Sequence, residues 1–212
     1  MTASAEGVVK YDPHFEVRPL PLGVQGRIAE LNYWRGVLYV NKLIGLGDDG
    51  IGYGNISVRV KPTDGLFAIT STQTGHLADL GPEHYAVVTG YDLTGNQLEA
   101  YGSFLGPSSE AMTHGALYED PAIGAVAHAH NTAIWNRAEA LGIPATSVDV
   151  EYGTPEMAQE MERLLREPRV KEGGILAMLG HKDGIITFGQ NLDEAGQIML
   201  EYLHQASPDH WP

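Results

Sequence analysis

Two histidines in the middle of the chain are spaced so that both could bind one metal ion. They are His128 and His130, in the run Val126-Ala127-His128-Ala129-His130 at the end of a predicted strand. Side chains at positions i and i+2 of a strand leave from the same face, about 7 Å apart along the strand. Two imidazoles placed in this way can converge on one ion. The alternative is a pair of ordinary histidines that bond backbone groups.

A carboxylate, Glu110, follows two serines at the predicted start of a helix. The segment Pro107-Ser108-Ser109-Glu110 introduces this helix, and the serines can cap it. A helix N-terminus offers unpaired amide groups and the positive end of the helix dipole, which suits a phosphate or a carboxylate. Near a metal-bound substrate, Glu110 could act as a general base. The competing interpretation is a plain cap with an acid in the first helical turn.

Two turns rich in small residues could add to an anion site. Gly54-Asn55-Ile56-Ser57 leads into one predicted strand, and Thr74-Gly75 follows another. Such turns can present backbone amides and hydroxyl groups to an anion. Taken singly, neither turn indicates a function.

Composition limits both the chemistry and the partners. The 212 residues include no cysteine, which excludes disulfides, thiolate metal ligands and a cysteine nucleophile. Any metal must then be bound by imidazole and oxygen, which points to zinc, manganese, iron or cobalt. The net charge of −14, with only 13 scattered Lys and Arg residues, argues against nucleic acid or an anionic membrane as a partner. No apolar run approaches the roughly 18 residues of a membrane span, and the first residues do not resemble a secretory signal, so we expect a cytoplasmic protein.

The hydrophobic pattern predicts one mixed α/β domain over residues 25–212, preceded by an extended arm at residues 1–24. The arm is either a frayed tail or a segment that packs on the domain or on a neighbouring subunit. A long amphipathic helix is predicted from Gln25 to about 45–47, and Thr154-Pro155-Glu156 predicts a capped helix start. The remaining pattern predicts strands at residues 56–60, 66–70, 86–89, 123–130, 175–179 and 184–188, and helices at residues 108–118 and 193–204.

Taken in order, these motifs resemble those of the class II aldolase/adducin family. The ordered set is Gly54-Asn55-Ile56-Ser57, Thr74-Gly75, Pro107-Ser108-Ser109-Glu110 and His128-Ala129-His130, and the likeness runs from about residue 26 to residue 204. The family includes fuculose-1-phosphate aldolase and ribulose-5-phosphate 4-epimerase. The resemblance implies a three-layer α/β/α domain around a mostly antiparallel sheet. It also implies a homotetramer with active sites at subunit contacts.

The resemblance gives each motif an expected role. His128, His130 and His181 would bind a divalent metal ion, with zinc as the first choice and manganese, cobalt or iron as alternatives. Glu110 would transfer the proton, and could also bind the metal when no substrate is present. The phosphate of a sugar phosphate, or an equivalent anion, would be held by a set of small polar residues: Asn55, Thr74, Gly75, Ser108 and Ser109.

Three further side chains have two interpretations each. His114 lies one helical turn beyond Glu110 and matches a histidine of the family, so it either supports the site or lies on the helix surface. Aldolases of this family use a tyrosine from a longer C-terminal tail near the leaving aldehyde. Tyr152 or Tyr202 could replace it, although each could instead be a packing residue.

The expected chemistry follows from charge. Removing a proton beside a carbonyl creates an enediolate, and a divalent ion stabilises that charge directly. We therefore expect a metal-dependent aldolase-type lyase that cleaves a C–C bond in a small ketose phosphate or a similar hydroxy-carbonyl anion. A decarboxylase or dehydratase on the same scaffold is the alternative. An epimerase ranks lower, because epimerases of the family carry aspartate at the position of Glu110. A non-catalytic adducin-like binding module ranks last, since it has no use for two strand histidines together with Glu110.

Overall fold

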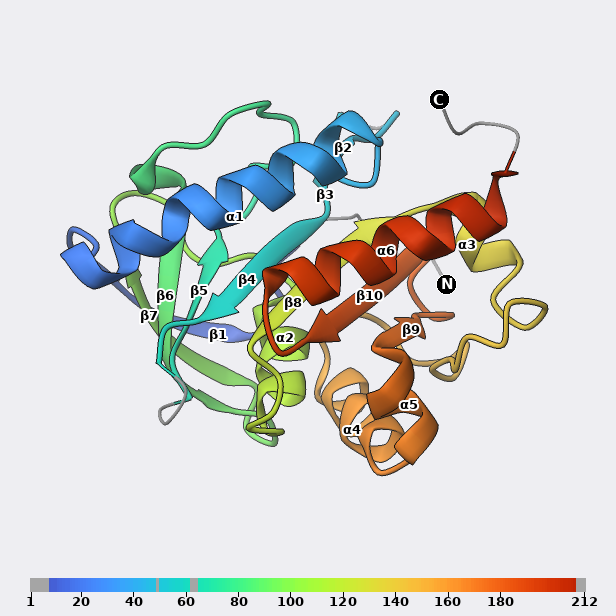
Figure 1. The fold of residues 1–212 in the computed structure, drawn as a ribbon. Helices are drawn as coiled ribbons and strands as arrows, with labels where there is room; N and C mark the ends of the chain where they lie inside the picture. The colour runs from blue at the N-terminus through green and yellow to red at the C-terminus, as the bar shows by residue number, and fades with distance from the viewer. Residues whose placement is uncertain (1–7, 49, 62–64, 209–212) are drawn as a thin grey trace.

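The computed structural model describes residues 8–48, 50–61 and 65–208, which fold around one eight-stranded sheet (Figure 1). The strand order is β1-β7-β6-β5-β4-β8-β10-β9, and each pairing in this sheet is antiparallel apart from that of β1 with β7. The predicted α/β fold with a mostly antiparallel sheet is confirmed. The strands are β1 Asp12–Val17, β4 Asn55–Arg59, β5 Phe67–Thr70, β6 Tyr85–Asp92, β7 Gln97–Gly102, β8 Ala125–His130, β9 Ile175–Ala177 and β10 Gly184–Gly189, with β2 Gly45–Leu46 and β3 Gly52–Tyr53 as a separate pair.

Helices cover both faces of the sheet and give the molecule its three layers (Figure 1). α1 (Leu22–Val40) and α6 (Leu192–Ala206) pack on one face. α2 (Ala111–Tyr118) and α4 (Pro155–Leu165) pack on the other. The shorter helices are α3 Thr132–Asn136, α5 Pro168–Gly173 and the 3-10 turn η1 Pro82–His84.

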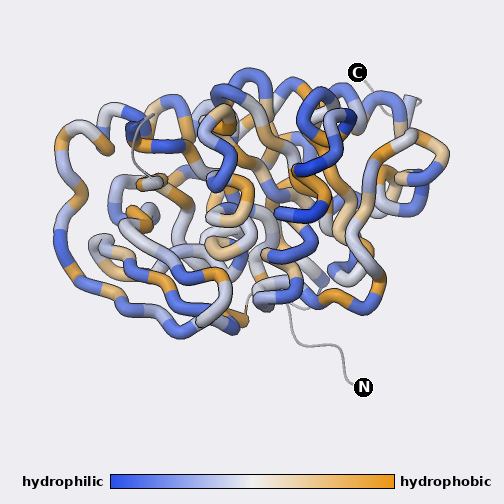
Figure 2. Tube along the Cα trace, turned by 90° about the horizontal axis from the view of Figure 1, so that it is seen from below, coloured by the Kyte–Doolittle hydropathy of each residue, from blue (hydrophilic) through white to orange (hydrophobic). Residues whose placement is uncertain are grey.

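Each face of the sheet has its own hydrophobic core, because strand side chains alternate between faces. In β8, Ala125, Ala127 and Ala129 enter the core shared with α1 and α6, whereas Val126 enters the core shared with α2 and α4. Figure 2 shows how closely polar and apolar residues alternate along the chain. Within the described ranges no helix has the length and apolar character needed to cross a membrane.

α1 begins and ends earlier than the sequence pattern predicts. It starts at Leu22 rather than at Gln25, directly after the N-cap residue Pro21, whose carbonyl oxygen accepts from Val24 N and Gln25 N. It ends at Val40 rather than near residues 45–47, because Lys42 takes a left-handed φ of 58°. Residues 41–44 therefore belong to the loop before β2 and not to the helix.

The N-terminal segment supplies an edge strand. β1 pairs in parallel with β7, with Asp12 opposite Gln97 and Val17 opposite Gly102. Residues 12–17 of the arm therefore pack on the domain, which is one of its two predicted interpretations. Residues 1–7 lie outside the described ranges. β7 was also not predicted, although Leu98 and Ala100 alternate with the polar Gln97 and Glu99 as in a half-buried strand. The helices α3 and α5 were not predicted because each has only five or six residues.

The contact between α1 and α6 yields a stability prediction. Gly196 in α6 lies directly against the Trp34 ring, and a Cβ there would overlap the ring. We expect Gly196→Ala to lower the free energy of unfolding by about 1–3 kcal/mol, the usual cost of overpacking. The control is Gly26→Ala in α1, where a Cβ would meet nothing within 4 Å. Because alanine has a higher helix propensity than glycine, this variant should be more stable than the wild type by up to about 1 kcal/mol. Urea unfolding measures the stability of both variants. A Gly196→Ala variant as stable as the wild type would contradict the close contact between Gly196 and Trp34.

Candidate metal centre

The residues that the motifs single out meet at one edge of the sheet. β8 ends at His130, and its two neighbours begin beside it, with Asn55 of β4 opposite His128 and Gly184 of β10 opposite His130. β5 and β7 also end at this edge, since they alternate in direction with β4 and β6. The loops after β5 and β7 therefore lie beside the end of β8.

His128 and His130 point toward one another from the α2 and α4 side of β8. Their Nε2 atoms are 3.2 Å apart. Nδ1 of His128 lies 3.1 Å from the carbonyl oxygen of Ile185. Because a carbonyl only accepts, Nδ1 carries the proton and the lone pair of the His128 Nε2 atom faces His130. This is the tautomer that a metal ligand needs.

His181 reaches the same point from the turn between β9 and β10. The two residues that follow it form a tight turn, in which Gly184 N donates to His181 O at 2.9 Å and Asp183 takes a left-handed φ of 62°. The His181 ring stacks on His128 with centroids 5.1 Å apart and meets His130 edge-on at 4.7 Å. One ligand atom from each of the three rings lies within 4.8 Å of the others.

This group of three imidazoles could hold a divalent metal ion. Nitrogens at the usual zinc distance of about 2.0–2.1 Å stand about 3.3 Å apart in a tetrahedral site, close to the 3.2 Å between the Nε2 atoms of His128 and His130. His128 is 1% exposed. Its burial, followed by the neighbouring His130 and His181, lowers the pKa of His128 well below 6.5. His128 is therefore neutral at neutral pH and keeps its lone pair for a cation.

Glu110 lies beside the histidines with its carboxylate buried. The residue is 1% exposed, and its Oε1 atom is 3.3 Å from Nδ1 of His181. Its Oε2 atom accepts a hydrogen bond from Thr113 Oγ1 at 2.6 Å. A buried carboxylate needs hydrogen bonds or a positive charge nearby, and an ion bound by the three histidines would supply such a charge.

The helix that follows Glu110 begins later than predicted. α2 starts at Ala111, so Ser108 and Ser109 precede it and Glu110 is its N-cap residue. The interpretation of Glu110 as an acid in the first helical turn is therefore wrong. The two serines stay outside the helix because Ser108 N bonds Thr70 O at 3.2 Å, which ties this turn to the end of β5.

The start of β4 and the serine turn are joined through one threonine. Thr70 O accepts from Ser108 N, and Thr70 Oγ1 accepts from Ile56 N at 3.3 Å. Asn55, Ser108 and Ser109, three of the residues predicted to bind an anion, are buried around this point. In the part of the chain that the structure describes, the buried Oδ1 atom of Asn55 has no hydrogen-bond partner. Buried polar atoms are normally bonded, so Asn55 is a candidate for contact with a ligand.

Thr74 and Gly75, the other two predicted anion-binding residues, lie in the loop after β5. Thr74 Oγ1 donates to Ser71 O at 2.8 Å. A Cβ on Gly75 would lie 2.6 Å from Tyr53 N, so this close approach to β3 requires glycine. Arg35 is 2% exposed and donates to Thr74 O at 2.8 Å and to Gly75 O at 3.3 Å. Arg35 was not among the predicted site residues, although an arginine on the apolar side of an amphipathic helix was an available signal.

His114 packs behind Glu110 in α2 and is fully buried. Its Nδ1 atom is 2.7 Å from Ser57 Oγ, which is in turn 2.8 Å from the Tyr118 hydroxyl. Burial lowers the pKa of His114 to about 3, so the ring is neutral. The helix-surface interpretation of His114 is therefore wrong. The network ties α2 to β4 close to Asn55.

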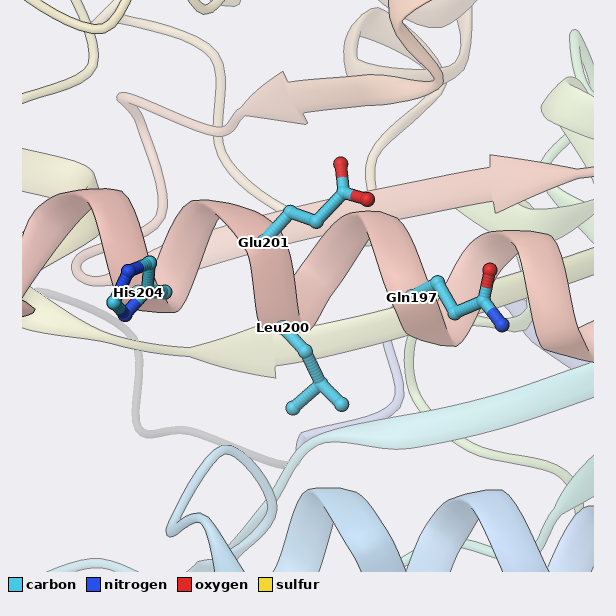
Figure 3. Close-up of a pocket in the computed structure, with 4 residues that line it drawn as sticks. All are labelled: Gln197, Leu200, Glu201 and His204. Atoms are coloured by element: carbon cyan, nitrogen blue, oxygen red, sulfur yellow. The ribbon is translucent and has the colours of Figure 1, made fainter. Parts of the chain in front are cut away.

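The structure brings Tyr152, and not Tyr202, to the histidines. The Tyr152 ring stacks on His181 with centroids 4.4 Å apart. Tyr202 belongs to α6 and packs against the core on the other face of the sheet. A surface pocket lies on that same helix, lined by Gln197, Leu200, Glu201 and His204 (Figure 3). Because α6 covers the face opposite to α2 and α4, this pocket is separate from the histidine site.

The fold and the three-histidine group define a class of protein: a three-layer α/β domain with a candidate metal centre at one edge of its sheet. Residues 39–207 match the family model described as Class II Aldolase and Adducin N-terminal domain. The chain therefore belongs to this family, whose class II aldolases use a divalent metal. No curated protein sequence gives a significant match to the chain.

Solved structures share the fold at low sequence identity. L-fuculose-1-phosphate aldolase from Thermus thermophilus has a TM-score of 0.62 and 22% identity, over 85% of this chain and 90% of that one. YgbL from Escherichia coli, which is described by three alternative activities (aldolase, epimerase and decarboxylase), has a TM-score of 0.63 and 20% identity, over 87% and 88%. A sugar-phosphate aldolase from Thermotoga maritima has a TM-score of 0.62 and 16% identity, over 89% and 98%. At these identities the likeness shows the fold alone.

Metal analysis tests the histidine group. We expect wild-type protein incubated with zinc or manganese and then desalted to retain about one ion per chain. His128→Ala should weaken metal binding by more than about 100-fold, because loss of an outer partner alone costs about 10–100-fold. His14→Ala removes an exposed histidine of β1 and should change nothing. Wild-type protein that takes up neither metal would contradict the site.

Proposed function

We propose that this protein is a metal-dependent aldolase-type lyase that cleaves a C–C bond in a small ketose phosphate or a similar hydroxy-carbonyl anion. The observation that carries the proposal is the position of Glu110. Its buried carboxylate lies 3.3 Å from His181 Nδ1, at the edge of a three-histidine group that could hold a divalent ion. A proton-transferring group beside a metal site is the combination that enediolate chemistry needs.

The three histidines would hold the ion in this proposal. Zinc is the first choice, with manganese, cobalt and iron as alternatives, because imidazole suits all of them. When bound, the ion supplies the positive charge that stabilises an enediolate. His128 is already neutral in the folded protein because burial lowers its pKa, so it need not lose a proton before it binds metal.

Glu110 would move the proton. The Thr113 hydroxyl holds Oε2 at 2.6 Å, which leaves Oε1 on the side of the histidines. This oxygen can take a proton from a substrate carbon or hydroxyl and later return it. Because Glu110 is buried, bulk water does not compete for the proton.

The loops at the same edge of the sheet would bind the anionic end of the substrate. The chain carries a net charge of −14, so an anion needs local donors to enter the site. Hydroxyl groups and backbone amides provide these donors without adding a charged side chain. The proposed set is Asn55, Thr74, Gly75, Ser108 and Ser109.

A decarboxylase or dehydratase is the alternative, because both reactions can use the same metal and the same proton-transferring carboxylate. One fold can carry several chemistries, so the fold by itself does not choose among them. An epimerase ranks lower because position 110 is glutamate. A binding module ranks last, since burying His128 and His181 beside the carboxylate of Glu110 costs free energy and has no function in such a module.

Assembly and location belong to the same proposal. A homotetramer with active sites at subunit contacts follows from the family resemblance. A cytoplasmic location and a lack of nucleic-acid or membrane partners stay predictions from composition.

Glu110→Gln separates the role of the carboxylate from metal binding. We expect the variant to keep its zinc and to lose turnover by about 10²–10⁴-fold, the usual contribution of a general acid or base. Glu156→Gln removes an exposed acid from the first turn of α4 and is the matched control. Steady-state kinetics and metal analysis of the same samples measure both effects. Unchanged turnover in Glu110→Gln would show that Glu110 does not carry the proton.

A product assay identifies the reaction. Metal-restored protein is incubated with a panel of ketose phosphates and hydroxy-acids, and the products are followed by mass spectrometry and NMR. An aldolase splits the substrate into two carbonyl fragments, a decarboxylase releases carbon dioxide, a dehydratase loses water and an epimerase leaves the mass unchanged. We expect two fragments from at least one ketose phosphate. Carbon dioxide or water loss without C–C cleavage would replace the proposed lyase by its alternative.

A further inference from the structure

The residues just before β1 contact two loops that lie beside the histidine group. Asn96, in the turn between β6 and β7, fixes their backbone, since its Nδ2 atom donates to Lys10 O at 2.9 Å. Tyr11 is 4% exposed, and its hydroxyl lies 3.0 Å from Pro107 O and 3.1 Å from Ser108 O. The segment is thus held directly against the turn that precedes α2.

Lys10 contacts Tyr152 in two ways. Its Nζ atom donates to Tyr152 O at 3.0 Å and stands 3.9 Å from the centroid of the Tyr152 ring. Glu151 Oε2 accepts from the same ammonium at 3.0 Å. Tyr152 in turn stacks on His181, with 4.4 Å between centroids and 25° between ring planes. A continuous chain of contacts therefore runs from the N-terminal segment to the third predicted metal ligand.

The loop that carries Tyr152 fits closely between its neighbours. Gly153 takes a φ of +67°, and a Cβ there would lie 3.3 Å from Ser109 O and 3.7 Å from Lys10 Cβ. On the other side, a Cβ on Gly180 would overlap Val150 O. The two glycines allow the loop to fill the space between Lys10 and the turn that carries His181.

We propose that Lys10 and Tyr152 are positioning residues that hold His181 ready to bind metal, an inference that rests on the proposed metal site. His128 and His130 are fixed by strand pairing, whereas His181 comes from a loop. An imidazole that is free to rotate loses that freedom when it binds an ion, so orienting it beforehand favours binding. Stacking on Tyr152 restricts the ring. The Lys10 ammonium restrains Tyr152 through the hydrogen bond and through cation–π attraction.

Zinc affinity of the full-length protein tests this role independently of the reaction. Competition with a chromophoric chelator gives the zinc dissociation constant, and urea unfolding of the metal-free protein reports stability. We expect Lys10→Met and Tyr152→Leu each to weaken zinc binding by about tenfold or more, as is usual for outer partners of metal ligands. Lys10→Arg keeps the charge and Tyr152→Phe keeps the ring, so both should bind zinc like the wild type.

The matched control is Lys171→Met. Lys171 also pairs with a carboxylate, Asp120 Oδ2 at 2.6 Å, but Asp120 precedes the start of β8, at the opposite end of this strand from His130. We expect this variant to bind zinc like the wild type. A tenfold loss here as well would overturn the specific role of Lys10.

The outcomes separate this inference from the function on which it rests. Unchanged zinc constants in Lys10→Met and Tyr152→Leu, with or without a loss of stability, would overturn the positioning role and leave the metal site standing. If Tyr152→Leu does not fold, Lys10→Met decides. Wild-type protein that binds no zinc would overturn both proposals. Zinc binding without lyase activity would overturn the reaction only, and the zinc constants would still decide the role of Lys10 and Tyr152.

Discussion

The antiparallel pairing of β8 with β4 on one side and β10 on the other is the constraint on which the site depends. It sets His128 opposite Asn55 and Ile186, and His130 opposite Gly184. Because side chains alternate along a strand, a slip of one residue would turn both imidazoles into the core under α1 and α6. The alanines of β8 and the two separate cores oppose such a slip. The antiparallel pairing continues from β4 through β7, so the loops after β5 and β7 lie at the same edge as the turn before β10.

The site is polar but lies almost entirely inside the protein. His128, His181 and Glu110 are each at most 4% exposed, and burying such groups is costly unless they are paired. The surrounding structure provides part of this pairing, through Ile185 O for His128 and through Thr113 for Glu110. A divalent ion would supply the remaining positive charge and would bring neutral imidazoles and a carboxylate into one favourable arrangement. Rigid support from the strands, α2 and the Tyr152 stack would then hold the reacting groups in place.

Features encoded within a few residues could be predicted from the sequence, and features that depend on distant contacts could not. The His128 and His130 pair follows from strand period, and Thr154 caps α4 through a bond from Met157 N, as its motif predicts. His181 needed the family resemblance, because no local pattern links a turn residue to a strand far away in sequence. The predicted start of α2 was too early, because Ser108 N donates to the carbonyl oxygen of Thr70 in β5 and the serines therefore stay outside the helix. Lys10 was missed for the same reason, since its contact with Tyr152 spans most of the chain.

Anomalous diffraction from crystals grown with zinc tests the central claim most directly, because it locates the ion without relying on a variant or an assay. We predict a single strong peak enclosed by the rings of His128, His130 and His181, about 2.0–2.1 Å from one nitrogen of each. A zinc peak bound elsewhere on the chain, with none among these three rings, would contradict it.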